Sequence, residues 1–136
     1  MRRNCLRERI RERIVTSKED VFFPREFLDL SDEDQVLRAL RELMKEKRLV
    51  RIGYGVYARA FPSDLSGEAV LDSKNGFLGA ARQTLSKLGV PWEMSQAEKA
   101  YNEGRTTQIP ANAVVRIKGR FTRKLHLNNM ELRLER

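Results

Sequence analysis

The fold is decided by residues 49–59, which read LVRIGYGVYAR. Two runs rich in β-branched and aromatic side chains, residues 49–52 and 56–59, flank Gly53-Tyr54-Gly55. Glycine readily adopts the positive φ angles that tight hairpin connections require. The stretch therefore predicts a two-stranded β-hairpin that turns at Tyr54.

The segment before this hairpin predicts a helix from Asp32 to about Lys47. Its apolar side chains recur at i, i+3, i+4 and i+7 and form one face, made of Val36, Leu37, Leu40, Leu43 and Met44. Ser31 is followed by three acidic residues. We expect its hydroxyl to cap the helix, while the carboxylates interact with the positive end of the helix dipole.

Two shorter elements are predicted further upstream. The four-residue spacing of Leu6, Ile10 and Ile14 predicts a first helix over residues 3–16. Residues 21–23 are a brief β-branched and aromatic run, and Pro24 suits the first turn of a short second helix that reaches Leu30. Three helices followed by a hairpin indicate a winged helix-turn-helix domain, which we place at residues 1–61.

A winged helix-turn-helix domain binds DNA with its third helix in the major groove and its hairpin, the wing, on phosphates or the minor groove. The polar side chains that we expect to contact DNA are Gln35, Arg38, Arg41 and Lys45 on the helix, and Arg48, Arg51, Tyr54 and Arg59 on the wing. The alternative interpretation is that the polar side chains of the helix form a charged face that contacts only solvent, because such faces are common.

The net charge favours a polyanionic partner. The 136 residues include 27 Lys and Arg against 19 Asp and Glu, which gives a formal charge of +8. Residues 1–60 hold 15 basic and 11 acidic side chains, and residues 61–136 hold 12 and 8, so both halves carry the surplus. Cations that bind phosphates release counterions, and this makes double-stranded DNA the first candidate partner.

The chain also resembles a known family. The motifs that carry the resemblance are residues 22–30 (FFPREFLDL), the ladder of Leu37, Leu40 and Leu43, residues 51–57 (RIGYGVY), and the pattern YNxGxTTQIP over residues 101–110. They resemble the AbiEi-type antitoxins of type IV toxin–antitoxin systems and their short relatives. The resemblance implies an amino-terminal winged helix that represses the protein's own operon. It also implies a nucleotidyltransferase-like toxin as partner, DNA contacts by Gln35, Arg38, Arg41 and Lys45, and Arg51 and Tyr54 on the wing.

A second unit, residues 66–136, is predicted after a stretch rich in turn formers at residues 61–67. We expect a small α+β domain with an antiparallel sheet. Its predicted elements are a short helix at 69–71, a helix over 77–88 ended by Gly89, a strand at 92–94, a helix from Ser95 to about Glu103, and strands at 113–117, 121–127 and 130–134. The last two strands form a hairpin across Asn128-Asn129 and cover a helix layer with Leu125, Leu127, Met130 and Leu132.

Five cations with no acid between them gather near the C-terminus: Arg116, Lys118, Arg120, Arg123 and Lys124. They could extend the DNA footprint or dock an acidic partner. Edge strands also carry cations that prevent aggregation, so the sequence leaves both interpretations open.

No catalytic, cofactor or metal site is predicted. His126 faces Glu131 in the expected hairpin with no nucleophile beside it, and Gly53-x-Gly55 lacks the remaining residues of a phosphate-binding loop. One cysteine and one histidine cannot form a zinc cluster, and no apolar run approaches the roughly 20 residues that cross a bilayer. We expect a cytoplasmic protein that is not an enzyme and does not contact a membrane.

Three hypotheses follow for the function. The first is a transcriptional regulator, an antitoxin that binds its own promoter and engages a toxin through residues 66–136. The alternative is a protein-interaction module whose winged helix or C-terminal hairpin pairs with a partner, or with a second copy of the chain, without specific DNA binding. The third is an RNA-binding factor that uses the 116–124 cations, which the lack of an aromatic stacking platform in the second half disfavours.

Overall fold

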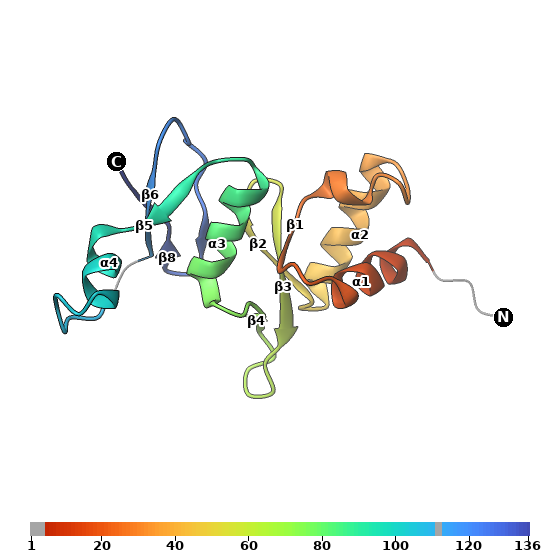
Figure 1. Cartoon of the computed structure of the whole chain (residues 1–136). Coiled ribbons are helices and arrows are strands. Elements are labelled where there is room, and N and C mark those ends of the chain that lie inside the picture. The colour runs from red at the N-terminus through yellow and green to blue at the C-terminus, as the bar shows by residue number, and fades with distance from the viewer. Residues whose placement is uncertain (1–4, 111–112) are drawn as a thin grey trace.

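The computed structural model describes residues 5–110 and 113–136, and it shows a mixed α+β protein, as predicted (Figure 1). Its helices are α1 (Leu6–Thr16), the 3-10 helix η1 (Pro24–Phe27), α2 (Glu33–Lys45), α3 (Gly76–Lys87) and α4 (Gln96–Asn102). Its strands are β1 (Val21–Phe22), β2 (Leu49–Gly53), β3 (Val56–Pro62), β4 (Ala69–Leu71), β5 (Trp92–Met94), β6 (Val114–Ile117), β7 (His126–Leu127), β8 (Met130–Glu131) and β9 (Arg133–Glu135).

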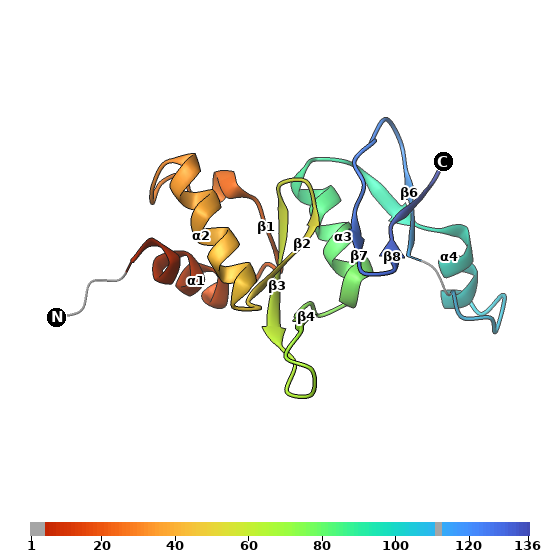
Figure 2. The same cartoon turned by 180° about the vertical axis from the view of Figure 1, so that it is seen from behind.

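The main sheet lies in the middle of the molecule, with α1 and α2 towards one end and α4 at the other (Figures 1 and 2). Its strand order is β1-β3-β2, and all pairs are antiparallel. The predicted hairpin is the β2–β3 pair, which turns at Tyr54 and Gly55, where Gly55 has φ +68°. The sequence therefore placed this hairpin and its turn correctly.

The strand β3 is longer than expected and carries a further partner. Residues 69–71 do not form the predicted short helix. They form β4, which pairs with the end of β3 through Ala60↔Leu71 and Pro62↔Ala69. Three residues are too few to complete a helical turn with its own hydrogen bonds, whereas the free edge of β3 offers partners for the same backbone groups.

Both faces of the main sheet are buried, because side chains alternate along its strands. On one face, Phe22, Leu49 and Tyr57 pack with α1, η1 and α2 in a cluster that includes Ile10, Phe27, Leu40 and Leu43. On the other face, Val21, Ile52, Val56 and Ala58 pack with α3 and the C-terminal residues, among them Phe77, Leu85, Val115 and Leu125. The two predicted units thus share a hydrophobic cluster. Whether the units 1–61 and 66–136 fold independently, as the sequence predicts, stays a prediction.

The C-terminal strands differ from the prediction. The hairpin across Asn128, which has φ +55°, is only β7 and β8, of two residues each, and Met130 is 46% exposed rather than packed on a helix. The chain then continues as β9, which pairs in parallel with β6 in a sheet of order β5-β6-β9. The predicted antiparallel sheet is therefore correct for the β5–β6 and β7–β8 pairs and wrong for the β6–β9 pair. Residues 121–125 form no strand, but Phe121 and Leu125 are buried in the shared cluster.

Helix α2 and its cap each begin one residue later than predicted, the helix at Glu33 and the cap at Asp32. The side chain of Asp32, and not the hydroxyl of Ser31, accepts a hydrogen bond from the backbone N–H of Gln35 at 2.9 Å. Aspartate and serine are about equally good caps, so position decides between them. The buried face is Val36, Ala39, Leu40 and Leu43, while Leu37 and Met44 are half-buried.

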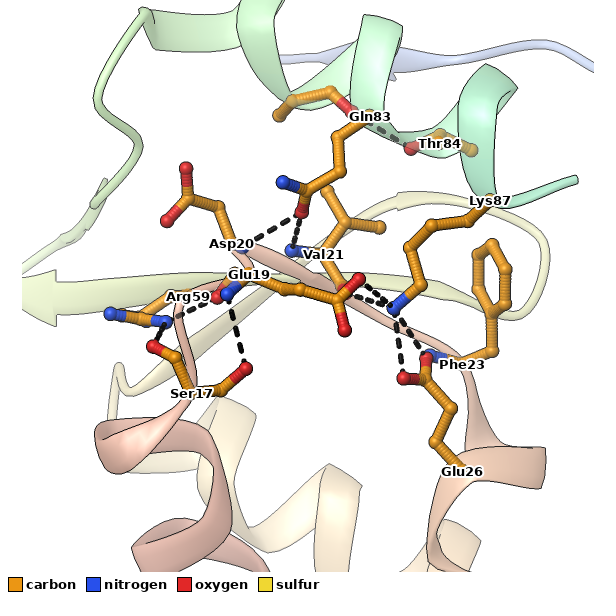
Figure 3. A network of polar contacts seen from close by, with 11 residues as sticks. Ser17, Glu19, Asp20, Val21, Phe23, Glu26, Arg59, Gln83, Thr84 and Lys87 are labelled. Atoms are coloured by element: carbon orange, nitrogen blue, oxygen red, sulfur yellow. Dashed lines mark hydrogen bonds and ion pairs between the residues drawn. The ribbon is translucent and has the colours of Figure 1, made fainter.

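Two side chains of α3 complete the outer edge of β1 (Figure 3). The Gln83 side-chain oxygen accepts hydrogen bonds from the backbone N–H groups of Asp20 at 2.7 Å and Val21 at 2.6 Å. One helical turn later, Lys87 donates to the Val21 carbonyl at 2.7 Å and pairs with Glu26 at 2.8 Å and Glu19 at 3.0 Å. The helix therefore satisfies backbone groups that would otherwise remain open at a sheet edge.

This arrangement predicts a loss of stability when the Gln83 acceptor is removed. Gln83→Met keeps the length of the side chain but leaves the N–H of Val21, a fully buried residue, without a partner. We expect the free energy of unfolding to fall by about 1–3 kcal/mol, measured by urea denaturation. Gln108→Met, at an exposed position, is the control and is expected to change it by less than about 0.5 kcal/mol. Equal effects of the two variants would contradict the assignment of Gln83 to the strand edge.

Candidate nucleic-acid interface

Helix α2 exposes the four side chains that the sequence analysis placed on DNA. Gln35, Arg38, Arg41 and Lys45 are all exposed, because the apolar face of the helix packs against α1 and the main sheet. The same helix starts with exposed Glu33 and Asp34, whose charges suit the positive end of its dipole. The three cations follow in the later turns, where Glu42 is the one acidic side chain of the helix, so the part of α2 that attracts anions lies beyond its first turn.

The hairpin adjoining α2 carries further exposed cations. Arg48 precedes β2, Arg51 lies within it, and both are exposed. The guanidinium of Arg51 lies 5.7 Å from the ring centroid of Tyr54, and its Nε donates to the Gly53 carbonyl at 3.3 Å. Tyr54 itself is 79% exposed at the tip of the turn. A cation over an aromatic ring at a hairpin tip presents both a charge and a flat surface to a ligand.

Arg59 does not join these residues. Its guanidinium is half-buried and donates from Nη2 to the backbone carbonyls of Ser17, at 2.9 Å, and Glu19. It lies 6.0 Å from the ring centroid of Phe22. These contacts tie β3 to the connection between α1 and β1, so Arg59 has a structural position and was wrongly grouped with the wing surface.

The exposed cations of α2 and the hairpin lack acidic partners, unlike several cations elsewhere in the described part of the chain. Within residues 5–110 and 113–136, none of Arg38, Arg41, Lys45, Arg48 and Arg51 takes part in an ion pair, whereas Arg7, Arg13, Arg82, Lys87, Lys99 and Arg105 do. Helix α2 carries three acidic and three basic side chains, so its three exposed cations stand out by their lack of ion pairs and not by a net charge of the helix.

The pair formed by Arg13 and Asp29 illustrates the contrast. Two hydrogen bonds of 2.8 Å join their side chains, and Arg13 also donates to the Glu26 carbonyl. The hydrogen bonds from Arg13 lower the pKa of the Asp29 carboxyl below its ordinary value. This pair holds η1 against α1 and leaves no free charge for a ligand.

The C-terminal cations divide into two groups. Lys118, Arg120, Arg123 and Lys124 are exposed and have no ion-pair partner in the described part of the chain. Arg116 is half-buried and lies 3.7 Å from Glu93, so it is bound within the β5–β6 sheet. The predicted cluster of five thus contains four free cations.

Two of these four cations meet the wing. Arg123 and Lys124 line an open pocket with Arg51 and Tyr54, and His126 completes it. The sequence predicts His126 only as a surface residue that faces Glu131, and that register is confirmed. Nothing in the sequence could reveal its proximity to Arg51, because this depends on how β7 packs against β2, and the two strands lie far apart in the chain.

The described residues contain no group of three or more His, Cys, Asp or Glu side chains placed to hold a metal ion. None of the helices in the described ranges has the length and apolar character that a membrane crossing requires.

The fold and this surface define a small α+β protein with unpaired cations exposed on one helix and the adjoining hairpin. The chain belongs to DUF6088, a family of unknown function, whose model matches residues 9–134. The match covers both predicted units. No curated protein and no solved structure is significantly similar to the chain.

Proposed function

We propose that this protein binds double-stranded DNA through α2 and the β2–β3 hairpin, and that residues 6–62 act as a winged helix-turn-helix. The order α1, β1, η1, α2, β2, β3 supports this arrangement, as does the hairpin that follows α2 directly. The observation that carries the proposal is the set of five exposed cations without acidic partners, Arg38, Arg41, Lys45, Arg48 and Arg51. Such cations bind phosphates with the release of counterions.

The charges along α2 also suggest how the helix meets the duplex. Glu33 and Asp34 at its first turn repel phosphates, whereas Arg38, Arg41 and Lys45 attract them. The later turns of α2 therefore lie closest to the backbone in this proposal. Gln35, with both a donor and an acceptor, is the side chain best suited to a base edge.

The resemblance to AbiEi-type antitoxins extends the proposal to a biological role. In that role the protein represses its own operon, and residues 66–136 engage a nucleotidyltransferase-like toxin. Finding a reading frame for such a toxin beside the gene would support this role. If no such frame is present, the antitoxin role is rejected, but the proposal of DNA binding is unaffected.

The direct test is the binding of the purified protein to a duplex from the region upstream of its own gene, measured by fluorescence anisotropy. About five phosphate contacts predict a slope near −4.5 in a plot of log affinity against log salt, so the affinity should fall several hundredfold between 50 and 200 mM salt. A lack of binding at 50 mM salt would reject the proposal. If charge reversal on the wing leaves the cellular function intact while changes in the β7–β8 hairpin abolish it, the protein is an interaction module instead.

A further inference from the structure

The wing and the C-terminal segment make an unusually close contact. A Cβ atom added at Gly53 would lie 2.7 Å from Leu125 Cδ2 and 3.0 Å from the Lys124 carbonyl oxygen. Leu125 is 1% exposed and belongs to the cluster that joins the two halves. Only glycine fits at position 53 without moving its neighbours, and this holds Arg123 and Lys124 beside the tip of the wing.

The contact creates an open pocket of about 380 Å³ with an unusual set of side chains. Arg51 and Tyr54 come from the wing, and Arg123, Lys124 and His126 come from the C-terminal segment. No carboxylate lines this pocket. In the described part of the chain these three cations form no ion pair, so their charges are available to a ligand.

We infer that this pocket binds a phosphodiester group of the DNA backbone, so that the C-terminal half takes part directly in DNA binding. A guanidinium presents parallel N–H donors that match two phosphate oxygens, and the Lys124 ammonium adds a compact charge. The ring nitrogens of His126 and the exposed Tyr54 hydroxyl are further hydrogen-bonding groups. The pocket is open to solvent, as binding to a continuous strand requires.

The inference rests on the proposed function for its ligand, but the pocket itself rests on geometry. The tip of the β2–β3 hairpin and the loop that leads from β6 to β7 lie on the same side of the molecule in both views (Figures 1 and 2). A duplex that lies along the wing would therefore meet both segments. The wing then acts as one wall of a phosphate clamp whose other wall is the 123–126 segment.

The test compares two double variants with equal charge changes in the same segment. Arg123→Ala/Lys124→Ala removes two cations of the pocket, and Lys118→Ala/Arg120→Ala removes two exposed cations that do not line it. We expect the pocket variant to bind the upstream duplex about 10-fold more weakly at 100 mM salt, with a salt slope reduced in magnitude by about 1 to 2. The control variant should lose less than about 3-fold. Equal losses, or no loss in either, would overturn the inference.

A second readout separates this inference from the proposed function. His126 is the only histidine in the chain, so its ring signal in an NMR spectrum reports on the pocket alone. Titration with the duplex at fixed pH should shift this signal in the wild type but not in the pocket variant. A shift with millimolar inorganic phosphate and no duplex binding would show a pocket for small phosphates, and would reject the DNA ligand together with the proposed function. Duplex binding without a His126 shift would reject the pocket alone.

Discussion

Replacing Arg38 and Arg41 together by alanine is expected to weaken the binding of the upstream duplex about 100-fold at 100 mM salt. The two side chains lie one helical turn apart on the exposed face of α2, and neither has an acidic partner among the described residues. Arginine contacts with DNA contribute about 1–3 kcal/mol each, and 1.4 kcal/mol corresponds to a tenfold change in affinity. The measurement is a fluorescence anisotropy titration of the wild type and the variant under identical salt.

The control for this prediction removes the same net charge elsewhere. Lys74→Ala/Arg105→Ala changes two exposed cations that lie outside α2, the wing and the C-terminal pocket. Its long-range effect on a polyanion should stay within about 3-fold at this ionic strength, because the Debye length is about 10 Å. A control variant that loses as much affinity as the α2 variant would show that binding depends on net charge and not on this helix. Unfolding of the α2 variant is not expected, since both of its positions are exposed.

The sequence predicted α2 and the hairpin well because both depend on neighbouring residues. The apolar spacing around Leu40 and the glycines around Tyr54 determine which groups face inward and where the chain reverses. Exposure of Arg38 and Arg41 followed from the same spacing. Arg59 was misplaced because its position in β3 does not reveal the Ser17 and Glu19 carbonyls that accept its hydrogen bonds.

The second half was predicted less well because its elements depend on distant partners. Residues 69–71 pair with the end of β3, and β9 adds in parallel to β6. Alternation of apolar residues cannot distinguish a long hairpin from a short one that is followed by a strand in another sheet. The pocket at the wing has the same origin, because Gly53 looks like an ordinary turn glycine until Leu125 packs against it.

Leu85 in α3 lies at the centre of the packing that the two halves share. Leu85 is fully buried and belongs to the cluster that contains Val21, Ile52 and Val56 of the main sheet. Leu85→Ala is expected to lower the free energy of unfolding by about 2–5 kcal/mol, because it removes buried methyl groups and leaves a cavity. Leu65→Ala, at a fully exposed position, should change it by less than about 0.5 kcal/mol.

Amide hydrogen exchange then shows whether the two predicted units unfold separately. Because the cavity at Leu85 lies against the main sheet, we expect the slowest amides of α2 to lose as much protection as those of α3, as in a single cooperative unit. Independent domains divided at residues 61–66 would instead lose protection in α3 and keep it in α2. The shared cluster favours the first outcome, in which the second half would support the proposed DNA-binding surface through packing as well as through the proposed contacts of Arg123 and Lys124.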